Sequence, residues 1–248
     1  MSAREVNVKK VKQAVKDLSL KANIVLRPDV FQALEKLYRE EKEQTQAKNM
    51  LNVLLENAKI AEEKRIPICQ DTGLVVVFVE LGKDVVLIGG DIIRAINEGV
   101  AEAYSEGSFR NSVVEDPLKR KNTGDNTPAS VHIDLVDGEN IGVAVMPKGF
   151  GAENKSRLAM MNPTADHEEI IDFCVETVKI AGPDACPPYV LGVGIGGTMD
   201  TCTYLAKKAL FRSIDEANPK AHIAELEEEI KIKVNELGIG VMGLGGGS

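Results

Sequence analysis

The sequence has no tryptophan, and aromatic residues make up only 4% of its 248 positions. A hydrophobic core must therefore be aliphatic, built from Val, Ile, Leu and Ala. The chain also lacks an excess of basic residues, because its formal net charge is -8, and this argues against a nucleic-acid-binding surface. No apolar run approaches the ~20 residues that cross a membrane, and the first residues carry no apolar signal segment. We expect a cytoplasmic protein that binds neither nucleic acid nor a membrane.

Cysteine is scarce as well, and no two of the four cysteines form a Cys-x-x-Cys pair. This excludes the spacing of a zinc ribbon or a thioredoxin-like site. Cys174 and Cys202 share helical faces with aliphatic residues, so we interpret them as small buried hydrophobes. Cys69 and Cys186 lie instead in predicted loops beside proline and near glycine, where a fixed backbone could hold sulfur toward a metal. Two thiolates are too few for a closed site, whereas three would leave one corner of a [4Fe–4S] cube open.

Apolar spacing predicts helices over residues 8–18, 27–41, 43–64, 91–107, 167–182, 201–211 and 220–237. Strands are predicted at 74–81 and 85–88, paired with each other, and at 131–135 and 141–145, which read as a hairpin around "DGEN". A further short strand is expected between 184 and 200. We find no internal repeat and no linker. The prediction is therefore one mixed α and β (α+β) domain, with helices packed on short, largely antiparallel sheets.

Several polar segments are candidates for chemistry rather than packing. "PICQDTG" places Cys69, Gln70 and Asp71 side by side between a charged helix and an apolar strand. Arg110, in "FRNSVVEDP", lies in a polar loop and could equally be a solvated arginine. "KGFGAENKS", which contains Gly151 and Lys155, combines cations, an amide and flexible backbone, a mixture that suits a carboxylate or phosphate. "NTGDNTPA" could be no more than a turn.

The segment "GVGIGG" matches the G-x-G-x-x-G pattern of dinucleotide-binding proteins. It stands between an expected strand and an expected helix, and Asp215 follows at roughly the right distance for a ribose contact. However, the stretch before Asp215 shows no second strand to carry it. The pattern alone is weak, and the glycines could serve only a close approach of the backbone.

Five segments in order resemble one known family. "PICQDTG", "FRNSVVEDP", "NTGDNTPA", "KGFGAENKS" and "CPPYVLGVGIGGT" look like the iron–sulfur hydro-lyases of the class I fumarase and L(+)-tartrate dehydratase type. The resemblance covers most of the chain and is to the α subunit, or the N-terminal catalytic part, of those enzymes. It implies reversible hydration of a dicarboxylate, with fumarate and malate, the pair of the tricarboxylic acid cycle, as the expected substrates.

The resemblance also implies a cofactor and site residues. A [4Fe–4S] cluster would act as a Lewis acid, with Cys69 and Cys186 as two of its three protein ligands. Gln70 would hydrogen-bond the substrate, and Asp71 would handle the proton of the hydroxyl or water. Arg110 would clamp a carboxylate, Lys155 would bind substrate as well, and the backbone at Gly151 would let the substrate approach closely.

At the C-terminus the sequence departs from the family pattern. The third cysteine ligand is expected beyond residue 248, so we expect 1–248 to be a hydro-lyase α-type catalytic domain that is truncated there. Cys202 as third ligand is the alternative. The resemblance further implies a β subunit that carries remaining catalytic groups, and a homodimer of α subunits.

Three alternatives stay open at this point. L(+)-tartrate or a related hydroxy acid could replace malate, because the carboxylate clamps would look alike. A nucleotide-binding oxidoreductase would follow from the G-x-G-x-x-G pattern, and titration with a nicotinamide would reveal it. A non-catalytic scaffold subunit would bind no cluster.

Overall fold

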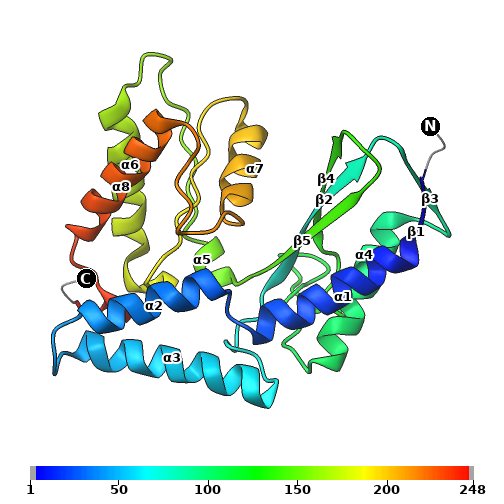
Figure 1. Ribbon diagram of the computed structural model, residues 1–248, viewed down its shortest axis with the longest axis horizontal. Helices are drawn as coiled ribbons and strands as arrows, with labels where there is room; N and C mark the ends of the chain where they lie inside the picture. The colour runs from blue at the N-terminus through cyan, green and yellow to red at the C-terminus, as the bar shows by residue number, and fades with distance from the viewer. Residues whose placement is uncertain (1–3, 246–248) are drawn as a thin grey trace. The chain divides into compact units, whose positions relative to one another are not determined.

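The computed structural model describes residues 4–245, and the chain forms two compact units. The first unit contains Met1–Leu26 and Asn57–Phe150, and the second contains Arg27–Glu56 and Gly151–Ser248. The predicted combination of helices with short strands is confirmed (Figure 1). That residues 1–248 form one catalytic domain stays a prediction.

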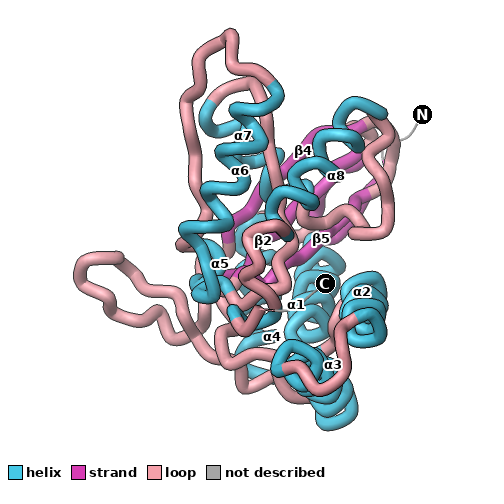
Figure 2. The backbone as a smooth tube through the Cα atoms, turned by 90° about the vertical axis from the view of Figure 1, so that its left-hand side faces the viewer, coloured by secondary structure: helices cyan, strands magenta, loops and turns pink. Residues whose placement is uncertain are grey.

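The central sheet of the first unit has three strands in the order β4-β2-β5 (Figure 2). β2 (Leu74–Gly82) pairs in parallel with β4 (Ser130–Val136) and antiparallel with β5 (Ile141–Lys148). The predicted hairpin of β4 with β5 is therefore wrong, because β2 lies between them. The physical reason is the composition of β2, whose run Val75–Val79 is buried on both faces and belongs in the middle of a sheet.

A second, two-stranded sheet pairs β1 (Arg4–Asn7) with β3 (Val85–Ile88) in parallel. The predicted pairing of β3 with β2 is therefore wrong, and the sequence analysis does not predict β1. The sequence gives no clear signal for β1, because the strand has only four residues and continues directly into α1 (Val8–Ile24). Asn7, its last residue, is also the N-cap of that helix. Two of the three strand pairings among residues 4–245 are parallel, so the expectation of largely antiparallel sheets is wrong.

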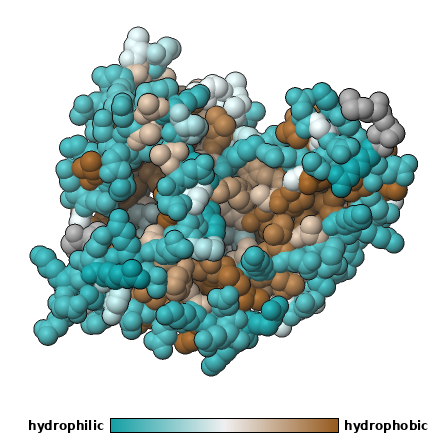
Figure 3. Space-filling view, in the orientation of Figure 1, coloured by the Kyte–Doolittle hydropathy of each residue, from teal (hydrophilic) through white to brown (hydrophobic). Residues whose placement is uncertain are grey.

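Two helices of the first unit, α1 (Val8–Ile24) and α4 (Ile92–Glu106), pack on each other, and α1 also packs against β5. Gly99 permits the close approach, since a β-carbon there would lie 2.5 Å from the carbonyl oxygen of Lys12. Hydrophobic side chains gather along the side of α1 that faces the strands, and its outer surface is hydrophilic (Figure 3). The core is aliphatic as predicted, apart from two aromatic residues: it contains Val11, Val15, Ile24, Val75, Val77, Val79, Ile96, Val100, Ala103, Tyr104 and Phe109.

The second unit is helical. It contains α2 (Pro28–Glu40), the first part of α3 (Gln46–Lys64), α6 (His167–Ala181), α7 (Met199–Ala209) and α8 (Ala221–Asn235). Three short turns complete it: α5 (Phe150–Glu153), which begins at the unit boundary, η1 (Gly182–Ala185) and η2 (Val241–Gly243). Each helix predicted from apolar spacing is confirmed. No helix in the part of the chain that the structure describes is long and apolar enough to cross a membrane.

Two small clusters form the core of the second unit. One joins α6 to α8 through Ile171, Cys174, Leu226 and Ile230. The other joins α2, α3 and η2 through Ala47, Leu51 and Val241, with Leu34, Leu37 and Tyr38 packed against them. Because Val241 of η2 belongs to this cluster, the glycine-rich segment after α8 is packed against α2 and α3 as far as η2.

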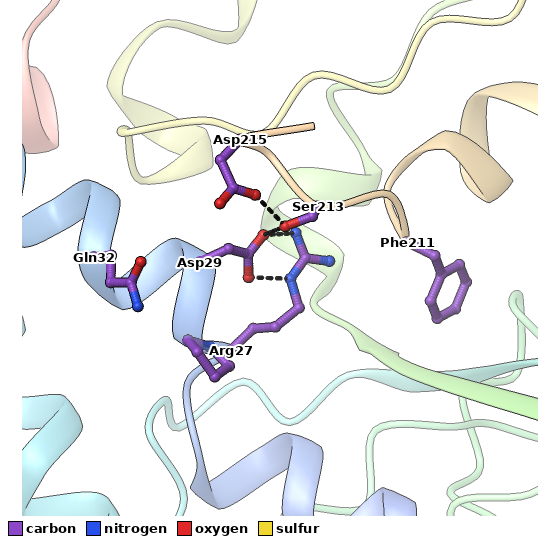
Figure 4. Close-up of a pocket in the computed structure, with 7 residues that line it drawn as sticks. Arg27, Asp29, Gln32, Phe211, Ser213 and Asp215 are labelled. Atoms are coloured by element: carbon purple, nitrogen blue, oxygen red, sulfur yellow. Dashed lines mark hydrogen bonds and ion pairs between the residues drawn. The ribbon is translucent and has the colours of Figure 1, made fainter. Parts of the chain in front are cut away.

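An arginine clamp fixes the start of α2. The Arg27 guanidinium donates to both oxygens of Asp29 at 2.6 and 2.7 Å, and to the carbonyl oxygens of Leu210 and Arg212 at 3.0 and 3.1 Å. Asp29 also accepts from the Ile214 N–H at 3.0 Å, and the Arg27 hydrogen bonds hold the pKa of Asp29 well below its usual range. The clamp lies in a shallow hollow of about 390 Å³ (Figure 4). Since its polar groups are engaged with one another, we interpret it as a structural clasp between α2 and the turn after α7.

Candidate active site

The segment of Cys69, Gln70 and Asp71 follows α3 and precedes β2, as predicted. The residue before this segment, Ile68, is fixed by two backbone hydrogen bonds. Its N–H donates to the Asn23 carbonyl, and its carbonyl accepts from the Asn57 side chain, both at 2.9 Å. The Cys69 thiol is exposed. The backbone N–H of Asp71 points back to the Cys69 sulfur at 3.4 Å, so the three residues form a small turn with the sulfur at its surface.

The carboxylate of Asp71 is held in one orientation. Its Oδ2 accepts a hydrogen bond from the Phe150 N–H at 2.9 Å, and a β-carbon at Gly149 would lie 3.1 Å from the same oxygen. Gly73, at φ +62°, completes the close fit, because a β-carbon there would lie 2.2 Å from the Lys148 carbonyl oxygen. Asp71 is thus turned toward residues 148–150, where the chain must come near without side chains.

Arg110 lies beside the same turn. Its Nη1 donates to Gln70 Oε1 at 3.2 Å, while its carbonyl oxygen accepts from Thr72 Oγ1 at 2.9 Å. Residues 70 and 110 are far apart in sequence, so only the fold brings the amide and the guanidinium together. The first unit therefore gathers a thiol, an amide, a carboxylate and a guanidinium, which are four of the side chains predicted from sequence. Their catalytic roles stay predictions.

Asn126 supports this arrangement through buried hydrogen bonds. The sequence analysis missed this role because it treats "NTGDNTPA" as no more than a turn. Its side chain is fully buried. Its Oδ1 accepts from the N–H groups of Ser112 and Val113 at 2.7 and 3.1 Å, and its Nδ2 donates to the Gly73 carbonyl at 3.0 Å. One amide thus ties the segment after Asp71 to the segment after Arg110. Its φ of 60° fits the tolerance of asparagine for the left-handed region.

Tyr104 provides a second support that the sequence did not reveal. It is 1% exposed, and its hydroxyl donates to the Thr72 carbonyl at 2.5 Å. Burial raises the pKa of Tyr104 to about 12, so the hydroxyl remains a donor throughout the physiological range. A helical tyrosine among alanines and valines gives no sequence signal for this contact.

We expect Asn126→Ala to lower the free energy of unfolding by about 3–5 kcal/mol, because it leaves the N–H groups of Ser112 and Val113 without their acceptor and takes from the Gly73 carbonyl its closer donor. Asn126→Gly should lose nearly as much, although glycine accepts φ 60° without strain. Urea unfolding followed by circular dichroism measures both losses. Asn140→Ala, which removes one exposed bond from Arg4, is the matched control and should change stability little. A loss below about 1 kcal/mol for both Asn126 variants would contradict this support.

The second unit holds the other predicted residues around η1. Cys186 follows η1 in a left-handed conformation (φ 56°) and its thiol is exposed. Lys155 Nζ lies 2.7 Å from Asp184 Oδ2, and a β-carbon at Gly151 would lie 3.6 Å from the Asp184 carbonyl oxygen. Gly151, Lys155 and Cys186 therefore converge on one turn. Because Asp184 is largely exposed, its ion pair with Lys155 is weak and does not prevent Lys155 from binding an anion.

The segment after Cys186 is held by the chain's C-terminal part. The Met242 N–H donates to the Pro187 carbonyl at 2.8 Å, and a β-carbon at Gly243 would lie 2.5 Å from Cβ of Pro183. Tyr189 adds a hydrogen bond from its hydroxyl to the Gly182 carbonyl. The glycine-rich stretch around η2 thus fits against the loop that carries the thiol, which gives a structural reason for its composition.

The remaining two thiols differ from Cys69 and Cys186. Cys174 is buried in α6, as predicted, and burial raises the pKa of its thiol. Cys202 lies in α7 as predicted but is half-buried rather than buried, with its sulfur 3.4 Å from the Met199 carbonyl oxygen. Among residues 4–245 no group of three or more His, Cys, Asp or Glu side chains is arranged to hold a metal ion.

The "GVGIGG" segment is not a strand, so the short strand expected between 184 and 200 is wrong. Instead the segment runs against the side of α7. A β-carbon at Gly192 would lie 2.2 Å from the Ala206 carbonyl oxygen, and one at Gly194 would lie 1.9 Å from that of Cys202. The glycines therefore allow backbone to pack on a helix, and the strand that a dinucleotide fingerprint requires is missing.

Comparison with known proteins agrees with the motifs. The family model described as "Fumarate hydratase (Fumerase)" matches residues 12–248. The "Putative L(+)-tartrate dehydratase subunit alpha" of Methanocaldococcus jannaschii is 43% identical over 246 residues, which cover 96% of this chain and 85% of the relative. The "L(+)-tartrate dehydratase subunit alpha" of Escherichia coli K12 is 28% identical over 250 residues, which cover 100% of this chain and 82% of the relative. The chain therefore belongs to the fumarate hydratase family.

Proposed function

We propose that this chain is the α subunit of a hydro-lyase that adds water to a dicarboxylate and removes it again, with fumarate and malate as the substrate pair. The observation that carries the proposal is the convergence of Cys69, Gln70, Asp71 and Arg110 in the first unit. A dianionic substrate needs cationic donors, and loss of water needs a group to move a proton and a cation to assist the leaving hydroxide. These four side chains include the cationic donor, Arg110, and the group that moves a proton, Asp71.

The cation in the proposal is the open iron of a [4Fe–4S] cluster, and Cys69 and Cys186 are two of its ligands. The donor chemistry fits: both thiols are exposed at loops, and the Cys69 sulfur already accepts the Asp71 N–H at 3.4 Å. Hydrogen bonds to cysteine sulfur are a usual feature of cluster ligands. When bound, the cluster supplies a Lewis-acidic site for the substrate hydroxyl.

The chain's own side chains bind and orient the substrate. Arg110 has five N–H donors, of which Gln70 engages one in the described structure, so the guanidinium can also bind a carboxylate in a bidentate manner. We assign the second substrate carboxylate to Lys155, and a hydrogen bond to the substrate to the Gln70 amide. At Gly151 the absence of a side chain leaves the backbone open to the substrate.

We assign proton transfer to Asp71. Its Oδ2 is engaged by the Phe150 N–H, so the proton moves to and from the other oxygen, Oδ1. A single fixed orientation suits a group that exchanges a proton with a hydroxyl or water during the reaction.

Arg110→Ala should raise KM for the dicarboxylate by roughly ten- to a hundredfold, because one charge-assisted contact worth about 1.5–3 kcal/mol is lost. The visible absorbance of the cluster should be unchanged. Steady-state kinetics of the reconstituted enzyme give KM, and Arg94→Ala, which removes an exposed arginine of α4, is the matched control. An unchanged KM for Arg110→Ala would remove this residue from the site.

The second candidate function is dehydration of L(+)-tartrate, and the names of the two relatives above favour it. Those relatives are also named as alpha subunits, and we propose a β subunit as the partner of this chain. The experiment is anaerobic reconstitution with iron and sulfide, with and without the β subunit, followed by assays on malate, fumarate, L(+)-tartrate and related hydroxy acids. Turnover of tartrate alone would select the second candidate, and no turnover of any dicarboxylate would overturn both.

A further inference from the structure

Thr72 lies between Asp71 and Gly73, in the turn that begins at Cys69. It is 3% exposed, although its neighbours Cys69 and Gln70 are at the surface. The Thr72 hydroxyl donates to the Arg110 carbonyl oxygen at 2.9 Å. A hydroxyl has a single hydrogen to donate, and this one is engaged within the protein. Thr72 therefore acts on the protein itself rather than on a bound substrate.

Two hydrogen bonds join residue 110 to this turn. The bond from the Thr72 hydroxyl holds the main chain at Arg110. The bond from Arg110 Nη1 to Gln70 Oε1, at 3.2 Å, involves the side chain, and residue 110 is exposed. A long exposed side chain can adopt many rotamers. The place of the guanidinium thus depends on where the main chain that carries it is fixed.

Tyr104 anchors both sides of this connection. Its hydroxyl donates to the Thr72 carbonyl at 2.5 Å. Its own carbonyl accepts from the Phe109 N–H at 3.0 Å, and the two aromatic rings meet edge to face with centroids 5.4 Å apart. Because Phe109 directly precedes Arg110, these contacts form a ring that the Thr72 hydroxyl closes.

We infer that Thr72 is a positioning residue for Arg110, and that its hydroxyl keeps the guanidinium beside Gln70 and thereby sets the affinity for a substrate carboxylate. The part of this inference that concerns the carboxylate rests on the proposed function, whereas the part that concerns the position of Arg110 does not. Bidentate binding of a carboxylate requires a specific geometry. A displacement of about 1 Å is enough to weaken such an interaction strongly.

The first test compares two substitutions of Thr72. Thr72→Val keeps the shape of the side chain and removes the donor, so KM for malate should rise roughly two- to tenfold while kcat changes little. Thr72→Ser keeps the hydroxyl and should keep the parent KM. Thr177→Val is the matched control, because the Thr177 hydroxyl also donates to a main-chain carbonyl, that of Phe173 at 2.7 Å in α6. It should leave KM unchanged.

The second test is a double-mutant cycle, which separates positioning of Arg110 from a general loss of structure. Arg110→Ala keeps the main-chain carbonyl that Thr72 binds but removes the guanidinium. Adding Thr72→Val to Arg110→Ala should therefore leave KM at the value of Arg110→Ala alone. A further rise of KM in the double variant, as large as in the parent background, would show that Thr72 acts independently of Arg110 and would overturn the inference.

The third test needs no turnover. In a chain isotopically labelled at its arginine nitrogens, the heteronuclear NOE of each side-chain Nε–H reports motion on the ps–ns timescale. The signal that is missing in Arg110→Ala identifies residue 110. Thr72→Val should make this signal more mobile, whereas Thr72→Ser and Thr177→Val should leave it unchanged.

Circular dichroism establishes that each variant is folded, and Thr72→Ala takes the place of Thr72→Val if the latter is not. An unchanged KM, or an unchanged mobility of the Arg110 signal, in the folded variant would overturn the inference. If the reconstituted parent enzyme turned over no dicarboxylate, the proposed function would fail. The mobility of the Arg110 signal would then still decide whether Thr72 positions this arginine.

Discussion

Cys69→Ala and Cys186→Ala are each expected to abolish the visible absorbance of the reconstituted cluster and, with it, hydro-lyase activity. Removing one of three thiolates leaves a cube that is no longer held at three corners. The measurement is the absorbance spectrum and the iron content after anaerobic reconstitution. We expect the largest effect in this protein here, because loss of a ligand removes the cofactor rather than weakening one contact.

Cys174→Ala is the matched control for these variants. Its thiol is buried in α6, and burial raises the pKa of this thiol, so it is a poor thiolate ligand. This variant should keep the cluster while losing some stability from the core it shares with Ile171 and Leu226. Iron loss in Cys174→Ala alone, with full occupancy in Cys69→Ala, would reverse the assignment. Cys202→Ala, with an intermediate exposure of its thiol, tests the alternative that Cys202 is the third ligand.

Asp71→Asn should lower kcat by about 10²–10⁴-fold, the usual contribution of a positioned general acid or base. The amide has nearly the same shape but cannot take up the proton, so KM and the cluster spectrum should change little. Asp137→Asn is the control, because its side chain is 92% exposed and pairs with the exposed Lys83. Steady-state kinetics with the β subunit present give both constants.

A change confined to KM would show that Asp71 binds substrate without moving the proton. Retention of the parent kcat would remove Asp71 from the chemistry. The hydrogen bond from the Phe150 N–H to Asp71 requires a separate measurement of thermal stability. A strong loss of thermal stability in Asp71→Asn would show that the carboxylate holds residues 148–150 in place. Part of the loss in kcat would then come from that structural change.

The helices could be predicted from the sequence because their signal is local. Apolar residues recur at helical spacing, and caps such as Asp91 and Asp166 mark their starts. Strand pairing could not be predicted in the same way. β4 and β5 are close in sequence and alternate as a hairpin would, yet β2, from much earlier in the chain, lies between them. Pairing depends on which strand is buried on both faces, and that is decided by what packs on the sheet.

The same difference between local and long-range information applies to the candidate site. The sequence by itself determined which chemical groups are present: a loop thiol with an amide and a carboxylate beside it at residues 69–71, an arginine at 110 and a second loop thiol at 186. Only the tertiary structure decided that Arg110 contacts Gln70 and that the glycines after Cys186 pack on α7. It also decided that the buried Asn126 joins the segment after Asp71 to the segment after Arg110. The physical reason is distance along the chain. The type of a side chain is fixed at one position, whereas a hydrogen bond between distant segments needs both partners, and here the partners lie 40 and 53 residues apart.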